Sequence, residues 1–146
     1  MTKPISRRRF GYEFIPSLLA ASAARAASAQ QPAASGPSTR RDVIEQELPG
    51  EPSRVLSLIE VTYRPGEGSP PHLHANGVMA YVVSGAIASK VGDGAEQTFH
   101  TGEAWWEPPG AIHRDSRNAS LDQPATLLAI YVAPKGATAA DLMKPL

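Results

Sequence analysis

The chain has 146 residues, and its 14 basic and 14 acidic side chains give a formal net charge of zero at pH 7. This length has room for one compact domain, and the 42% share of hydrophobic residues is ordinary for a globular protein. The absence of cysteine excludes disulfide bonds, thiolate metal sites and a cysteine-linked lipid anchor.

The amino-terminal 29 residues have the features of an export signal. Ser-Arg-Arg-Arg-Phe at residues 6–10 precedes a weakly apolar run at 14–24, a pattern that resembles a twin-arginine signal. Ala-Ser-Ala at 27–29 supplies a cleavage site, and the apolar run is shorter than the roughly 18 residues that a membrane span needs. We expect residues 1–29 to be removed, which leaves a soluble periplasmic protein without a membrane partner. The alternatives are an amphipathic anchor helix and a disordered basic tail.

Removal of this signal changes the charge of the chain. Residues 30–146 contain nine basic and 13 acidic side chains, a net charge of −4. Proteins that bind nucleic acids present a basic surface to the phosphates. We therefore expect no nucleic-acid partner.

The remaining sequence predicts one all-β domain. Residues 30–40 are polar and punctuated by proline and glycine, which indicates a flexible linker. The domain is expected at 41–135, followed by a tail or short helix at 136–146. Apolar segments separated by turn residues predict strands at 42–48, 54–63, 78–83, 86–91, 96–100, 104–107, 112–116 and 125–132. Many short strands are typical of a β-sandwich or barrel.

Three histidines are spaced as metal ligands. His72 and His74 are two residues apart, so on an extended strand both imidazoles leave the same face, roughly 7 Å apart at Cα. His113 follows a turn that ends one strand and directs the next. The first two alone could be half-exposed polar residues, but the third imidazole favours a site for one divalent metal ion.

The histidines lie in two stretches that resemble the two motifs of the cupin family. The first motif, G-x5-H-x-H-x3,4-E-x6-G, and the second, G-x5-P-x-G-x2-H-x3-N, match at Gly66, His72, His74 and Gly85, and at Gly102, Pro108, Gly110 and His113. The sequence departs from the motifs twice: Val78 stands at the glutamate position and Arg117 at the asparagine position, with Asn118 one place later. The resemblance covers residues 42–133 and implies a cupin double-stranded β-helix, which is a jelly-roll barrel.

The resemblance implies a metal site built from His72, His74 and His113. With Val78 in place of the carboxylate, three neutral imidazoles would leave the charge of the ion uncompensated and three octahedral positions open. Iron, manganese, copper, nickel and zinc all remain compatible with this site.

The missing glutamate also affects the candidates for catalysis. Acid–base chemistry would fall to Glu107, Tyr63, Tyr131 or a metal-bound hydroxide, with Glu107 and Tyr63 as the catalytic candidates. Glu107 could instead be a surface carboxylate, and Tyr63 a core aromatic residue. Strand alternation places Val82 on the same face as Val78, which predicts an apolar pocket wall.

Two further side chains are predicted to line the pocket. Trp105 and Trp106 are adjacent, so they point to opposite faces of a strand and one must be interior; we expect Trp106 at the pocket. Arg117 shares strand parity with His113 and could grip an anionic substrate through two hydrogen bonds. Arg117 could instead be a solvated charge at the end of a strand.

Several functions are compatible with this pattern. The resemblance implies a mononuclear metal enzyme that acts on a small organic substrate, with oxidative cleavage by a dioxygenase as the favoured chemistry and a lyase as another possibility. A non-catalytic periplasmic module that binds a small molecule or a metal is the alternative from another class. A homodimer is one expected assembly.

Overall fold

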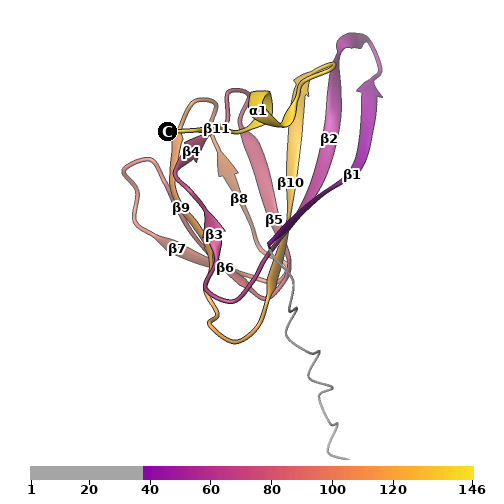
Figure 1. The fold of residues 1–146 in the computed structure, drawn as a ribbon. Helices are drawn as coiled ribbons and strands as arrows, with labels where there is room; N and C mark the ends of the chain where they lie inside the picture. The colour runs from indigo at the N-terminus through magenta and orange to yellow at the C-terminus, as the bar shows by residue number, and fades with distance from the viewer. Residues whose placement is uncertain (1–37) are drawn as a thin grey trace, which may run out of the picture. The chain divides into compact units, whose positions relative to one another are not determined.

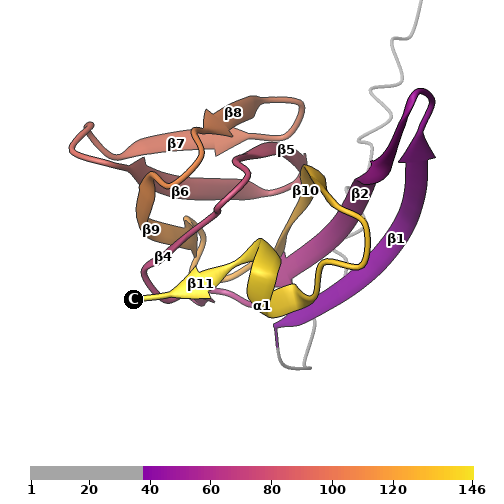
Figure 2. The same cartoon turned by 90° about the horizontal axis from the view of Figure 1, so that it is seen from above.

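The computed structural model describes residues 38–146. The expected signal at 1–29, and the expected linker up to residue 37, lie outside the described residues. The described chain forms two antiparallel sheets that enclose one hydrophobic core (Figure 1, and Figure 2 from above). The expected all-β fold is confirmed.

The two sheets hold all but one of the regular elements. The first has the order β1-β2-β10-β5-β8, with bounds Thr39–Leu48, Glu51–Tyr63, Ala125–Pro134, Val78–Ser84 and Ala104–Glu107. The second has the order β11-β4-β9-β6-β7, with bounds Lys144–Pro145, His72–Leu73, Ile112–Asn118, Ala86–Val91 and Gln97–His100. The short strand β3, Gly68–Ser69, also pairs with β9. Strand β1 begins at Thr39, so the last two residues of the expected linker belong to the first strand.

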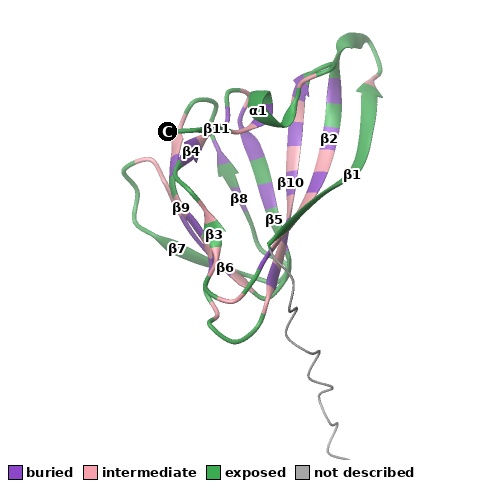
Figure 3. Ribbon diagram, in the orientation of Figure 1, coloured by how far each residue is buried: buried purple, intermediate pink, exposed green. Residues whose placement is uncertain are grey.

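Alternation along the strands creates the core. On β10, Leu127, Ala129 and Tyr131 are buried, and the residues between them are partly exposed (Figure 3). Ala129 pairs across to Ala80 on β5, and both line the main cavity. Small side chains on neighbouring strands thus keep space open inside the barrel, where larger ones would fill it.

A β-bulge changes which residues of β9 point inward. The register between β6 and β9 shifts by one residue at Arg114. His113 is buried before the bulge, whereas Ser116 and Asn118 are buried after it. The extra residue therefore reverses the alternation along the rest of the strand.

The carboxyl-terminal segment folds back against β4. Helix α1, Ala139–Leu142, begins where the Asp141 carboxylate accepts a hydrogen bond from the Thr138 backbone N–H (2.8 Å). Strand β11 then pairs with β4, and Figure 1 shows both elements at one end of the barrel. No helix within residues 38–146 is long and apolar enough to cross a membrane.

Candidate metal centre

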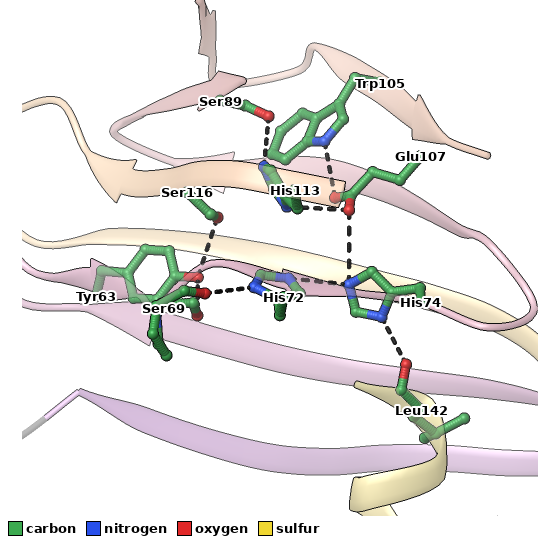
Figure 4. A network of polar contacts seen from close by, with 11 residues as sticks. Tyr63, Ser69, His72, His74, Ser89, Trp105, Glu107, His113, Ser116 and Leu142 are labelled. Carbon is green, nitrogen blue, oxygen red and sulfur yellow. Dashed lines mark hydrogen bonds and ion pairs between the residues drawn. The ribbon is translucent and has the colours of Figure 1, made fainter. Parts of the chain in front are cut away.

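Four buried side chains converge inside the barrel. His72 lies on β4, His74 directly after it, Glu107 at the end of β8 and His113 on β9, and each is at most 4% exposed. Their donor atoms all lie within 4.8 Å of one another (Figure 4). Donors that share one ion at bonds of about 2.1 Å can be at most about 4.2 Å apart, so the widest pair needs to close by less than an ångström.

Backbone carbonyls fix the protonation of two of the rings. The Nδ1 atoms of His72 and His74 lie 2.7 Å from the Pro70 carbonyl and 2.6 Å from the Leu142 carbonyl. A carbonyl can only accept, so each Nδ1 carries the proton and each Nε2 carries a lone pair. The two Nε2 atoms face each other at 3.1 Å. Two lone pairs at this distance repel each other, whereas a cation placed between them would attract both.

Glu107 and His113 complete the ligand group. Glu107 accepts a hydrogen bond on Oε1 from the Trp105 indole N–H (3.0 Å), which orients the carboxylate. Its Oε2 lies 3.0 Å from His113 Nδ1 without forming a hydrogen bond, and both buried atoms lack a hydrogen-bond partner among the described residues. Ser89 Oγ contacts the other ring nitrogen of His113 at 2.8 Å. Native proteins rarely leave such atoms unsatisfied, so three nitrogens and one oxygen fit a bound divalent ion.

The environment keeps these groups in the forms that bind metals. Burial lowers the pKa values of His72 and His74, which favours the neutral imidazole. Burial alone would raise the pKa of Glu107, but the adjacent His113 and His74 hold it below its ordinary value. Neutral imidazoles and an ionised carboxylate are the ligand forms that a divalent ion requires.

Glu107 occupies the place that Val78 leaves empty. The two residues are Cα partners on the neighbouring strands β5 and β8. A carboxylate therefore reaches the histidines from the adjacent strand. The expectation of a site without a carboxylate is therefore corrected. It rested on the motif position, Val78, and not on Glu107, the residue that pairs with Val78. The sequence does contain one indication that Glu107 points inward: alternation over residues 104–107 places it on the same face as Trp105.

A cavity of about 260 Å³ lies beside the ligand group. Its walls are mostly apolar, with Ile59, Val61, Val78, Ala80, Leu127 and Ala129 among the lining residues. Tyr63 also lines it, and its hydroxyl lies 2.6 Å from Ser69 Oγ and 3.2 Å from Ser116 Oγ. Burial raises the pKa of Tyr63, so the phenol stays protonated near neutral pH. The cavity suits a small ligand, since it falls just below the ~300–1,000 Å³ typical of binding pockets.

Comparison with known proteins identifies the family. The sequence profile of the cupin domain matches residues 59–131, which is half of the chain. The chain belongs to the cupin family.

Solved structures share this cupin fold. TT1209 from Thermus thermophilus is 27% identical, with a TM-score of 0.54 over 67% of this chain and 84% of that one. An uncharacterized conserved protein with a double-stranded β-helix domain from Klebsiella pneumoniae subsp. pneumoniae is 24% identical, with a TM-score of 0.52 over 71% and 83%. DMSP lyase DddQ from Ruegeria pomeroyi is 17% identical, with a TM-score of 0.57 over 70% and 50%. No curated protein matches this chain.

Only some of the residues that were predicted to line the pocket of this cupin border its cavity. Val78 lines the cavity, whereas Val82 is buried deeper in the core and does not border it. Trp105, rather than Trp106, points inward, because it shares the face of Glu107. Trp106 is 52% exposed on the outer face of the sheet, opposite Met79. The placement of Trp106 in the pocket is therefore corrected.

Arg117 also lies outside the cavity. Its guanidinium donates to Asp115 Oδ2 (2.9 Å) and Glu96 Oε1 (2.8 Å). The expected parity with His113 fails because the bulge at Arg114 adds one residue between them. For the same reason Asn118 points inward.

Asn118 has a structural role near the cavity. Its side-chain amide donates to the carbonyl oxygens of Arg64 (3.1 Å) and Gln123 (2.7 Å), and its Oδ1 accepts from the Ser120 N–H (2.9 Å). These bonds tie β9 to the end of β2 and to the loop before β10. Asn118 thus fixes the loop that follows its strand.

Proposed function

We propose that this cupin binds one divalent metal ion through His72, His74, Glu107 and His113, and acts as a mononuclear metal enzyme on a small organic substrate. The observation that carries the proposal is the pair of Nε2 lone pairs 3.1 Å apart, beside a carboxylate oxygen and a ring nitrogen without hydrogen-bond partners. A divalent ion would satisfy all four atoms at once.

The ligand set restricts the ion only in part. Three imidazoles and one carboxylate suit iron, manganese, copper, nickel and zinc. When bound, the ion would supply Lewis acidity or, for the redox-active metals, one-electron chemistry. Glu107 offsets one of its two positive charges, which raises the expected affinity above that of three histidines alone.

The cavity favours oxidative cleavage over proton abstraction. Among the described residues that line it, Glu107 is the only carboxylate, and it faces the histidines. In the metal-free protein, burial raises the pKa values of Tyr63 and Tyr131, so both phenols stay protonated near neutral pH. A lyase that removes a proton needs a base with a pKa near the working pH. The mostly apolar walls instead leave the chemistry to the ion, which supports a dioxygenase-like reaction.

The same lack of a free base also fits a non-catalytic binding module. Such a module needs a shaped cavity and an anchor, but no proton route. Oxygen consumption separates the two functions, because only the enzyme consumes oxygen in step with the loss of its substrate.

The test is an oxygen-electrode assay with small organic acids and their amides, on protein loaded with iron, manganese or copper. We expect the wild type to consume oxygen while substrate disappears, and His113→Ala to do neither. Binding of a compound without oxygen uptake or chemical change would overturn the enzyme and support the binding module.

We further propose that the cupin is exported to the periplasm by the twin-arginine pathway. The support is the arginine triplet in residues 6–10 and the small residues at 27–29. Export in the folded state would allow the ion to be loaded in the cytoplasm, before competing metals are met outside.

A further inference from the structure

Arg40 places a positive charge at the rim of the cavity. It lies near the start of β1, where it pairs with Val61 on β2, and it lines the cavity together with Ser38 and Thr39. The Ser38 hydroxyl holds this end of the strand by donating to Glu67 (2.6 Å) and accepting from the Arg64 backbone N–H (3.2 Å). Arg40 also borders a second hollow beside β1. Arg40 therefore lies at the edge of the cavity.

Arg40 borders the same cavity as the ligand group. The residues that line this cavity include His72, His74, Glu107 and His113 as well as Arg40. A ligand that entered the cavity to reach the ion would therefore lie close to the side chain of Arg40.

No carboxylate within residues 38–146 forms an ion pair with Arg40. Its neighbour Arg41 pairs with Glu60 at 3.2 Å, and Arg64 pairs with Glu67 at 3.0 Å. Residues 1–37 contain one acid, Glu13, which belongs to the segment expected to be removed. With residues 1–29 removed as expected, residues 30–37 add no acid that could pair with Arg40.

The balance of charge favours an anionic ligand. With a divalent ion bound, the cavity would hold two positive charges from the ion and one from Arg40, against the single negative charge of Glu107. An excess of positive charge beside apolar walls attracts anions. The volume of about 260 Å³ limits the ligand to a small molecule.

We propose that Arg40 makes this cavity selective for small organic carboxylates, gripping the carboxylate at the rim while the apolar body of the ligand extends toward the histidines. The guanidinium fork matches a carboxylate through two parallel hydrogen bonds. The apolar wall on β2 and β10 covers the body, and the hydroxyl of Tyr63 offers one polar contact. This inference rests on the proposed function, since it assigns the substrate class of the same site.

Binding measured by calorimetry tests the proposal without turnover. The probes are acetate, propanoate, succinate and benzoate, each compared with its uncharged amide, on zinc-loaded and on metal-free protein. Arg40→Gln removes the charge and keeps much of the length. Arg41→Gln is the matched control, because the adjacent side chain points away from the cavity and pairs with Glu60.

We expect at least one acid to bind the wild type more tightly than its amide. Arg40→Gln should weaken that acid by about tenfold, the loss typical of a hydrogen bond to a charged group, and leave the amide unchanged. Arg41→Gln should match the wild type.

Two results would overturn the proposal: no acid binds better than its amide, or both arginine variants behave alike. If zinc does not bind at all, the proposed function fails, but the preference for acids in metal-free protein still decides the role of Arg40.

Discussion

Glu107 is the only negatively charged side chain among the described residues of the cavity, and its charge should dominate metal affinity. Glu107→Gln keeps the size of the side chain and an acceptor for the Trp105 N–H, but removes the charge. We expect the dissociation constant for zinc or manganese to rise by at least about tenfold, because a neutral amide oxygen is a weaker ligand. Titration against a competing chelator measures this constant.

Glu103→Gln is the control for that titration, since Glu103 is exposed and accepts a hydrogen bond from the His100 backbone away from the site. An unchanged constant for Glu107→Gln would remove Glu107 from the ligand set.

The histidines also predict how the metal-free protein responds to pH. Burial lowers the pKa values of His72 and His74 from the ordinary 6.5, so the unfolded chain takes up protons at a higher pH than the folded one. Their contribution to stability is therefore complete above about pH 6.5 and is lost as the pH falls through the lowered folded values. Glu107, whose pKa is lowered from 4.5, extends the loss to more acidic pH.

Urea denaturation of chelator-treated protein between pH 8 and 5 measures this dependence. Replacing both His72 and His74 with glutamine should flatten it, whereas His100→Gln, at an exposed position, should not. A double variant as pH-sensitive as the wild type would contradict the assignment.

At the scale of residues, the sequence predicted the three histidines as ligands but named Glu107 only as a catalytic candidate, for a physical reason. His72 and His74 are set by a local spacing of two residues, which strand geometry translates directly into a shared face. Glu107 meets them only because β8 pairs with β5 in one register. That register depends on contacts between distant parts of the chain, and the motif position at Val78 gives no sign of it.

At the scale of elements, the carboxyl-terminal segment holds His74 in place. The Leu142 carbonyl accepts from His74 Nδ1, and β11 pairs with β4, which carries His72. Removal of residues 139–146 should weaken metal binding by about tenfold, as loss of a partner that orients a ligand does. Thr138→Ala is a milder control, because it removes the hydroxyl bond to Asp141 and keeps the segment.

Chelator titration and the NMR signal of the His74 Nδ1 proton report the effect of this truncation. Wild-type affinity together with a retained, protected Nδ1 proton would show that the segment does not position the ligand.

Strand prediction was exact for β6 and β8 and within three residues for the long central strands. The strands β2, β5 and β10 were all predicted close to their observed bounds, because long apolar runs define them. The bulge on β9 could not be predicted, since one extra residue leaves the composition of the strand unchanged while it reverses every later side chain. This reversal explains why Asn118 points inward and Arg117 lies outside the cavity.

For the whole molecule, the expected route of export gives a separate prediction. Replacement of Arg7, Arg8 and Arg9 by lysine preserves charge but removes the planar guanidinium groups. We expect the precursor to accumulate inside the cell with its amino terminus uncut, while the wild type appears in the periplasm starting near Gln30. Fractionation and amino-terminal sequencing measure both outcomes. Normal export of the triple-lysine variant would indicate general secretion instead, which needs only positive charge before an apolar run.

Metal content tests the central claim most directly, because the proposed chemistry depends on one ion among four buried side chains. Mass spectrometry of protein purified after native export should find about one divalent ion per chain in the wild type. His72→Ala and His113→Ala should each abolish stoichiometric binding while circular dichroism shows that the β fold persists. A full metal equivalent retained in both folded variants would contradict the site.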